Sequence, residues 1–291
     1  NDILARCEKA IEAAKQKGAN QIVTYVPKKG ELTRHEVDAK FKGQLTDALK
    51  NDRFVLHYQP IISLHGDTEE RYEVFVRLKI DDSDQLIMPQ DFLPAAERIG
   101  MSIAIDRWVL FRAIKEFSKK QAQGINTRFF IKLSASSIKD DTLMDWLSYQ
   151  VKEKQIPPNT LNFEIKETVA MTNLKSAKSL AQKLKAIGCC FVLDDFGAGA
   201  NPFQLLDHVD VDYIRLERNL MEDLTENTQN QETIKQLTEQ ATKLGKFTIA
   251  QHVPDASSLS ILWGIDVNFI QGYFLQEPLP TMEYDFTEMS G

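Results

Sequence analysis

Hydrophobic residues follow two alternating patterns along most of the chain. Short apolar runs rich in Val, Ile, Leu and Phe alternate with stretches in which apolar residues recur every three or four positions. The first pattern predicts buried strands and the second predicts helices. The predicted strands are 55–62, 72–78, 128–133, 161–165, 190–194, 213–216, 247–250 and 268–270. Helical patterns, such as those at 103–120 and 233–244, lie between most of them.

This order predicts an α/β protein. About eight strands with helical crossovers favour a (β/α)8 TIM-like barrel, and a doubly wound open sheet is the alternative. In such a barrel, functional groups collect where the strands end, at the carboxyl face.

The first 52 residues follow a different pattern. Apolar residues recur at helical spacing from Leu4 to Ala14, Gly18 ends that pattern, and a short strand is expected at 21–25. A second helix is expected from about Thr33 to Asn51. A helix and a strand alone cannot make a domain, so this segment is either a decoration of the main domain or the end of a preceding one. The chain begins with Asn rather than Met, which predicts a fragment.

Composition excludes several functions. The chain has 291 residues, of which 43% are hydrophobic, and its formal net charge is −7, which argues against a protein that coats DNA or RNA. No apolar run approaches the roughly 18 residues of a membrane span, and no signal peptide is visible. Three Cys form no disulfide framework and five scattered His form no zinc motif, so we expect a reduced, cytoplasmic chain.

Acidic residues stand at the ends of several predicted strands. Glu73, Glu164, Glu167 and the pair Asp194-Asp195 would meet at one mouth of a barrel. Oxygen ligands without His suit Mg²⁺, Mn²⁺ or Ca²⁺. The alternative is that such acids cap the next helix or face solvent. The glycines of the following sequence FGAG allow the backbone to turn sharply or approach a ligand.

A series of motifs in order extends this pattern over most of the chain. They are YQPI at 58–61, EVFVR at 73–77, PAAE at 94–97, DRWV at 106–109, FEIKE at 163–167, DDFGAG at 194–199, DVDYIR at 210–215, and QGY at 271–273 with Pro278. Together they resemble the EAL domain, the fold of cyclic di-GMP phosphodiesterases and of their inactive receptor relatives. The resemblance implies an EAL-type barrel at 53–291, a linker helix at 31–52, and the C-terminal remnant of a GGDEF-like domain at 1–30.

Three positions depart from the pattern of active members, which hydrolyse cyclic di-GMP with two bound metal ions. Lys132 replaces a ligand Asn, and a charged ammonium has no lone pair for a metal. We expect Lys132 to act as a counter-ion for the acidic cluster and to occupy the metal's place. Arg215 replaces a Lys that holds the catalytic water, although Arg could still bind a phosphate bidentately. Gln251 replaces a Glu and cannot take a proton at neutral pH. These departures predict no catalytic residue and no bound metal.

The same resemblance implies a nucleotide site. Arg77 is expected to hold a phosphate, Phe75 and Leu275 to pack on guanine bases, and Gln59 and Asp106 to contact guanine or ribose. For Phe75 and Leu275 the alternative is core packing, and for Arg77 a salt bridge inside the barrel. The full set of predicted ligand-binding residues is Gln59, Glu73, Phe75, Arg77, Pro94, Asp106, Lys132, Glu164, Asp194, Asp195, Asp212, Arg215, Gln251, Gln271, Leu275, Gln276 and Glu277.

The sequence thus predicts a catalytically inactive receptor for cyclic di-GMP that signals to a protein partner. It resembles the FimX-type GGDEF–EAL regulators of type IV pili and twitching motility or biofilm control, which implies a PilZ-domain partner. No cofactor, no nucleic acid partner and no membrane contact is expected for this stretch of chain. The alternatives are a weak metal-dependent phosphodiesterase, and a structural domain that has lost the ligand.

Overall fold

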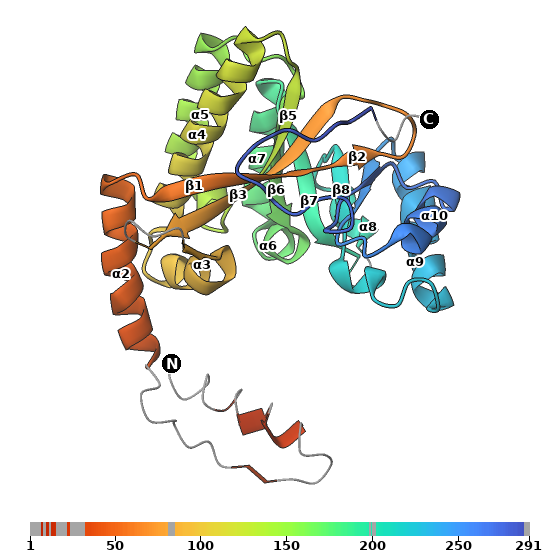
Figure 1. The fold of residues 1–291 in the computed structure, drawn as a ribbon, viewed down its shortest axis with the longest axis horizontal. Coiled ribbons are helices and arrows are strands. Elements are labelled where there is room, and N and C mark those ends of the chain that lie inside the picture. The colour runs from red at the N-terminus through yellow and green to blue at the C-terminus, as the bar shows by residue number, and fades with distance from the viewer. Residues whose placement is uncertain are drawn as a thin grey trace.

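The computed structural model describes residues 33–80, 85–197, 199 and 202–287, together with residues 7, 10, 11, 13–15, 22 and 23. Within this range one sheet of ten strands curls into a nearly closed barrel, with helices on its outer face (Figure 1). The predicted helix and strand at 1–30 lie largely outside the described residues, so their assignment to a GGDEF-like domain stays a prediction. No helix among the described residues is long and apolar enough to cross a membrane.

All eight strands predicted between residues 55 and 270 are present, and the run at 55–62 is divided into two. The strands are β1 (Phe54–Pro60), β2 (Ile62–Ser63), β3 (Glu70–Lys79), β4 (Leu86–Ile87), β5 (Thr127–Lys132), β6 (Leu161–Lys166), β7 (Cys190–Phe196), β8 (Tyr213–Leu216), β9 (Phe247–Ala250) and β10 (Phe269–Ile270). The α-helices are α2 (Arg34–Lys50), α3 (Pro89–Arg98), α4 (Ser102–Ala122), α5 (Asp141–Glu153), α6 (Glu167–Thr172), α7 (Leu174–Ala186), α8 (Phe203–Leu206), α9 (Thr228–Lys243) and α10 (Ala256–Gly264). Two 3-10 turns, η1 (Ser137–Lys139) and η2 (Arg218–Met221), complete the described elements.

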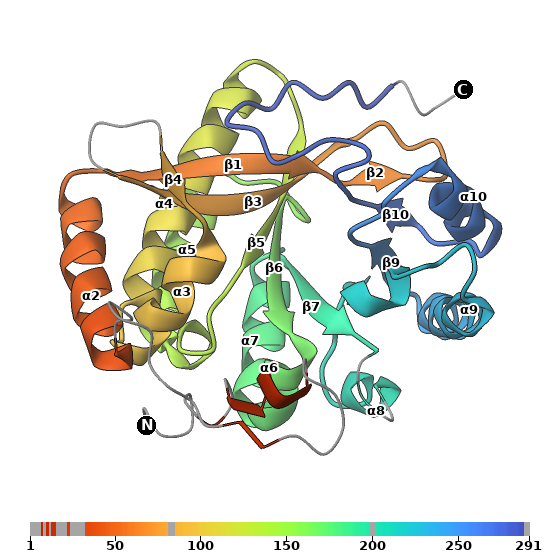
Figure 2. The ribbon, with the colours of Figure 1, turned by 60° about the horizontal axis from the view of Figure 1, so that its bottom comes forward.

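One continuous stretch of chain, which contains β1 and β2, supplies both ends of the strand order. β1 pairs with β3 at one end of the strand order, and β2 pairs with β10 at the other, both antiparallel. Figure 2 shows β2 beside β10, beyond the long ribbon of β1 and β3. Only residues 64–69 join β2 to β3, and a parallel connection needs about a dozen residues. The regular (β/α)8 barrel expected from the sequence is therefore modified, because its first strand is reversed.

The inside of the barrel has an apolar layer beneath a polar one. The apolar layer is a cluster separate from the main core: Ile61, Phe130, Cys190, Val192, Tyr213, Ile249 and Phe269. Side chains two residues apart in a strand point to the same face. Two residues further along these strands stand Lys132, Asp194, Arg215, Gln251 and Gln271. The alternation of side chains along the strands therefore forms the apolar layer and also places polar groups at the carboxyl end of the barrel.

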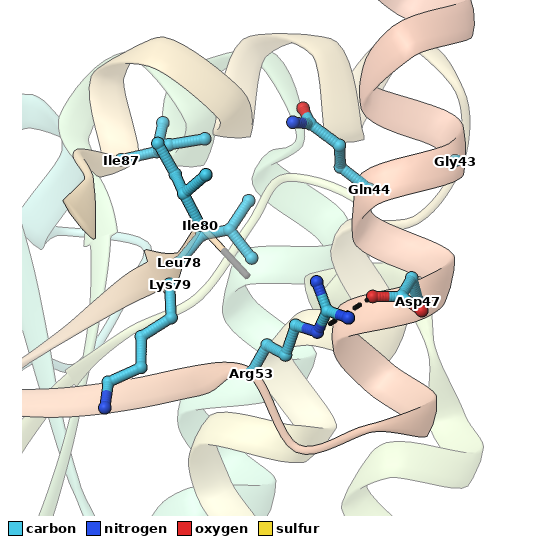
Figure 3. A pocket seen from close by; sticks show the side chains of 8 residues that line it. All are labelled: Gly43, Gln44, Asp47, Arg53, Leu78, Lys79, Ile80 and Ile87. Carbon is cyan, nitrogen blue, oxygen red and sulfur yellow. Dashed lines mark ion pairs between the residues drawn. The ribbon is translucent and has the colours of Figure 1, made fainter. Parts of the chain in front are cut away.

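The helix expected at Thr33–Asn51 is confirmed as α2. The Thr33 side chain accepts a hydrogen bond from the Glu36 backbone N–H, and the Glu36 side chain accepts one from the Thr33 N–H, so a capping box fixes the start of α2. Leu45 is fully buried against the core. A pocket of about 310 Å³ lies between α2 and the ends of β3 and β4 (Figure 3), and two of its lining residues, Arg53 and Asp47, form an ion pair at 3.0 Å.

Candidate functional site

The polar layer contains three buried carboxylates around one buried guanidinium. Glu73 on β3, Glu164 on β6 and Asp194 on β7 surround Arg215 from β8, whose side chain is 0% exposed. Arg215 Nη2 lies 2.6 Å from Glu164 Oε1, and Nη1 lies 3.1 Å from Glu73 Oε2. Nη1 also donates to Gln271 Oε1. Both ends of the guanidinium fork are therefore engaged inside the protein.

Lys132, the last residue of β5, lies above the same acids. Its Nζ is 3.1 Å from Glu73 Oε1 and 3.0 Å from Asp194 Oδ2. The prediction that Lys132 is an internal counter-ion is supported by these two ion pairs. The Lys132 side chain remains 44% exposed, whereas the two carboxylates are 2–3% exposed.

A third cation, which the sequence analysis did not single out, binds the remaining acid. Lys166 Nζ donates to Asp195 Oδ2 at 2.8 Å, and Gln251 Nε2 donates to Asp195 Oδ1 at 3.2 Å. Asp195 has a left-handed backbone, with φ 52°, and its side chain is 29% exposed, whereas that of Asp194 is 2% exposed. Lys166 is the basic residue of the motif FEIKE at 163–167, and its place beside the predicted acids was the available sequence signal. Glu167 lies aside from these pairs and accepts the Gly197 N–H at 3.0 Å.

Burial and neighbouring charge set the protonation of this cluster. Burial raises the pKa of Glu164 to about 7, although Arg215 opposes the shift. Burial also disfavours the charged form of Asp194, but Lys132 and Arg215 outweigh it and lower the Asp194 pKa. Burial would lower the pKa of Lys132, yet the carboxylates of Glu73 and Asp194 raise it. Lys132 therefore stays charged at neutral pH.

As arranged here, these carboxylates do not fit a divalent ion. Lys132 lies between Glu73 and Asp194, Arg215 lies on Glu164, and Lys166 lies on Asp195. An ammonium or guanidinium offers no lone pair to a metal. No group of three or more His, Cys, Asp or Glu in the described ranges is arranged to hold one.

The predicted base- and phosphate-binding residues lie along β1 and β3. Gln59 is paired in register with Glu73, and Phe75 and Arg77 follow on the same face of β3. The Arg77 guanidinium lies 5.3 Å from the centre of the Phe75 ring, and its Nη1 donates to the Val76 carbonyl at 3.0 Å. Burial lowers the pKa of Arg77, but Arg remains charged at any ordinary pH.

The C-terminal segment reaches this strand pair. Gln59 Nε2 donates to the backbone carbonyl of Gln276 at 2.9 Å. Leu275 is partly buried against the main core, and Glu277 is exposed. The structure therefore brings Gln276 to Gln59, and it gives Leu275 the core contact that was its alternative explanation.

Three other predicted site residues lie outside the charged cluster. Pro94 is exposed within α3. Asp106 is buried in α4, where its Oδ2 accepts from the Ser134 N–H at 2.8 Å and from Ser137 Oγ at 2.7 Å. Asp212 precedes β8 and accepts the Phe191 N–H at 2.8 Å, near the start of β7. Asp212 thus lies at the amino end of the strands, opposite the cluster, which corrects its expected place in the ligand site.

Taken together, fold and site define a class: an α/β barrel, nearly closed by a reversed first strand, with a charged cluster at its carboxyl end. The family model described as "EAL domain" matches residues 42–278, and the chain belongs to this family. The chain is 28% identical to the cyclic di-GMP phosphodiesterase PdeB of Shewanella oneidensis over 97% of its length, and 28% identical to PdeF of Escherichia coli over 82%. It spans about a third of each relative, 33% and 32%.

Solved structures of higher sequence identity are FimX EAL domains. The chain is 37% identical to the EAL domain of FimX from Pseudomonas aeruginosa bound to c-di-GMP, with a TM-score of 0.80 over 84% of this chain and 99% of that one. It is 30% identical to the Xanthomonas citri FimX EAL domain in complex with c-diGMP, with a TM-score of 0.81 over 87% and 98%.

Proposed function

We propose that this chain is a receptor that binds cyclic di-GMP at the carboxyl end of the barrel without hydrolysing it. One observation supports this most: Glu73, Glu164, Asp194 and Asp195 each face a cation of the chain itself. Two-metal hydrolysis needs such oxygens for metal ions that activate water and stabilise the leaving group. Carboxylates that are paired with Lys132, Arg215 and Lys166 cannot bind metal ions at the same time.

The ligand contacts follow from the residues beside this cluster. Arg77 presents a guanidinium suited to a phosphate, and Phe75 presents a ring suited to a base. Gln59, Gln276 and Glu277 supply polar groups for the guanine edge, because carboxylate and amide oxygens accept from N1–H and N2–H₂. Asp106 could contribute only through Oδ1, since Oδ2 already accepts two hydrogen bonds.

The two FimX EAL domains, at 37% and 30% identity, support the same ligand, since both were solved with cyclic di-GMP. By this similarity we further propose that the chain signals to a protein partner of the PilZ class, in type IV pilus or biofilm control. It would do so in the cytoplasm, as part of a GGDEF–EAL protein.

A weak metal-dependent phosphodiesterase is the second candidate. It is favoured by the two curated relatives described above, which are both named cyclic di-GMP phosphodiesterases, and by the presence of all four acids. This candidate requires Lys132 to leave Glu73 and Asp194 when a metal binds.

Calorimetric titration with cyclic di-GMP tests both candidates. It is run in Mg²⁺, in Mn²⁺ and in EDTA, and the nucleotide is recovered for chromatography. We expect the same affinity in all three buffers and intact cyclic nucleotide. Arg77→Ala should weaken binding at least about 10-fold, as loss of a charge-assisted hydrogen bond does. Arg98→Ala is the matched control, because Arg98 is an exposed residue at the end of α3, and this variant should bind normally. A linear dinucleotide product would establish the phosphodiesterase instead, and no binding in any buffer would contradict both.

A further inference from the structure

The charges at the carboxyl end of the barrel are arranged in two layers. The carboxylates of Glu73, Glu164 and Asp194 are at most 3% exposed, as is the guanidinium of Arg215. Above them, the Lys132 side chain is 44% exposed and the Lys166 side chain is 60% exposed. An anion that approaches through the mouth of the barrel therefore meets these ammonium groups before it meets the three buried carboxylates.

The two lysines are neighbours on the sheet. Lys132 is paired in register with Glu164, and Lys166 stands two residues further along β6, paired with Asp194. Because residues two apart share a face, Lys132 and Lys166 flank the same part of the mouth.

Both ammonium groups retain donor capacity. An ammonium has three N–H donors. Lys132 forms ion pairs with two carboxylates, and Lys166 donates to Asp195. Each ammonium group can therefore donate to one further oxygen atom without losing its carboxylate partners. Arg215 differs, because its Nη atoms are engaged by Glu164, Glu73 and Gln271 and its side chain is fully buried. The expectation that Arg215 could hold a phosphate bidentately is thereby corrected. Arg215 instead pairs with the buried carboxylates of Glu73 and Glu164.

We propose that Lys132 and Lys166 together bind a phosphodiester oxygen and take the place that divalent ions would have in an acid-only site. This inference rests on the proposed function, since the phosphodiester is that of cyclic di-GMP. The carboxylates hold the ammonium groups in position, and the ammonium groups bind the ligand. Affinity should then be independent of metal and dependent on ionic strength, because exposed charges are screened by salt.

The test compares lysine variants in EDTA. Cyclic di-GMP is titrated into the wild type, Lys166→Gln and Lys132→Gln at about 50 mM and about 300 mM NaCl. Lys183→Gln is the matched control, since Lys183 is also partly exposed and ion-paired, to Asp141 at 2.6 Å, on helix α7. We expect Lys166→Gln and Lys132→Gln each to raise Kd by about 10- to 100-fold, and to weaken its salt dependence. Lys183→Gln should change neither.

One further variant and one further measurement distinguish ligand binding from a purely structural effect. Lys166→Arg retains the charge and should recover most of the affinity. Circular dichroism reports whether Lys132→Gln is folded, and if it is unfolded, Lys166→Gln and Lys166→Arg decide the matter alone. Wild-type binding with unchanged Kd in Lys166→Gln would overturn this inference and leave the receptor function intact. Absence of wild-type binding would overturn the receptor function, and this inference with it.

Discussion

Lys132 Nζ and Asp194 Oδ2 are 3.0 Å apart, although β6 separates the strands that carry them. The ion pair therefore spans an intervening strand and ties β5 to β7 at the mouth of the barrel. Glu164, on the strand between them, lies under this pair with Arg215. Two cations and three carboxylates form one connected cluster. A substitution of one member should therefore change the energetic contributions of the others.

Lys132→Met should destabilise the fold at neutral pH. It leaves the buried carboxylate of Asp194 without its nearest cation, and breaking such a pair costs about 3 kcal/mol. Urea unfolding at pH 7 measures the loss. Adding Asp194→Asn should restore much of the free energy of unfolding, because it removes the unpaired charge. Lys183→Met, from an exposed pair, should cost less than about 1 kcal/mol. Equal losses in Lys132→Met and Lys183→Met would contradict this account.

Arg215→Lys should be destabilising although the charge is kept. A single ammonium cannot serve Glu164 and Glu73 in the forked geometry seen here, at 2.6 and 3.1 Å. We expect a loss of about 1.5–3 kcal/mol, the range of a hydrogen bond to a charged group. Chemical denaturation of Arg215→Lys, Glu164→Gln and the double variant forms a cycle that measures the coupling. Additive effects would show that the two side chains are energetically independent.

Asp106 should make stability fall as pH rises from about 4 to 6. Burial raises its pKa to about 6, from the ordinary 3.8, although the Ser134 N–H and the Ser137 and Ser134 side chains oppose the shift. The folded state then binds this proton more tightly than the unfolded chain, so stability is full below pH 3.8 and is lost as pH rises through 6. Two pKa units correspond to about 3 kcal/mol.

Other carboxyl groups titrate in the same window, so the measurement is a difference. The free energy of unfolding of Asp106→Asn minus that of the wild type should increase between pH 4 and pH 7 and then level off. A flat difference would show that Asp106 ionises in the folded state as it does in the unfolded chain.

Two glycine substitutions should have opposite signs. A Cβ on Gly272 would lie 2.3 Å from the Val253 carbonyl oxygen, so Gly272→Ala must displace backbone beside the site, at a cost of about 1–3 kcal/mol. A Cβ on Gly43 meets nothing within 4 Å, and Gly43 lies inside α2 beside the pocket of Figure 3. Gly43→Ala should stabilise by about 0.5–1 kcal/mol. Thermal unfolding of both variants compares them directly.

Removing the two exposed lysines should create a cation site. Lys132→Asn with Lys166→Thr leaves Glu73, Asp194 and Asp195 with oxygen donors and no ammonium partner, a set that suits Mn²⁺. Calorimetry with Mn²⁺ should detect binding in this double variant and none in the wild type. Saturable Mn²⁺ binding by the wild type would show that Lys132 yields its place, and would favour the phosphodiesterase.

The sequence by itself determined the strands, the helices between them and the chemistry of the site. Alternation of side chains along β5 puts Phe130 in the apolar layer and Lys132 in the polar one, and this can be read from the sequence because it is local. The same holds for the capping box of Thr33 and Glu36 at the start of α2. Motifs supplied the family, with Glu73, Glu164 and Asp194 among its acids.

Only the tertiary structure decided which charged side chains pair with each other. Lys166 meets Asp195, Arg215 is buried between Glu73 and Glu164, and Asp212 falls at the opposite end of the strands. These contacts join residues distant in sequence, and they depend on strand order, register and the reversal of β1, which no local pattern encodes. A charge in the sequence shows what a side chain can do, and the geometry of the barrel decides which opposite charge it meets.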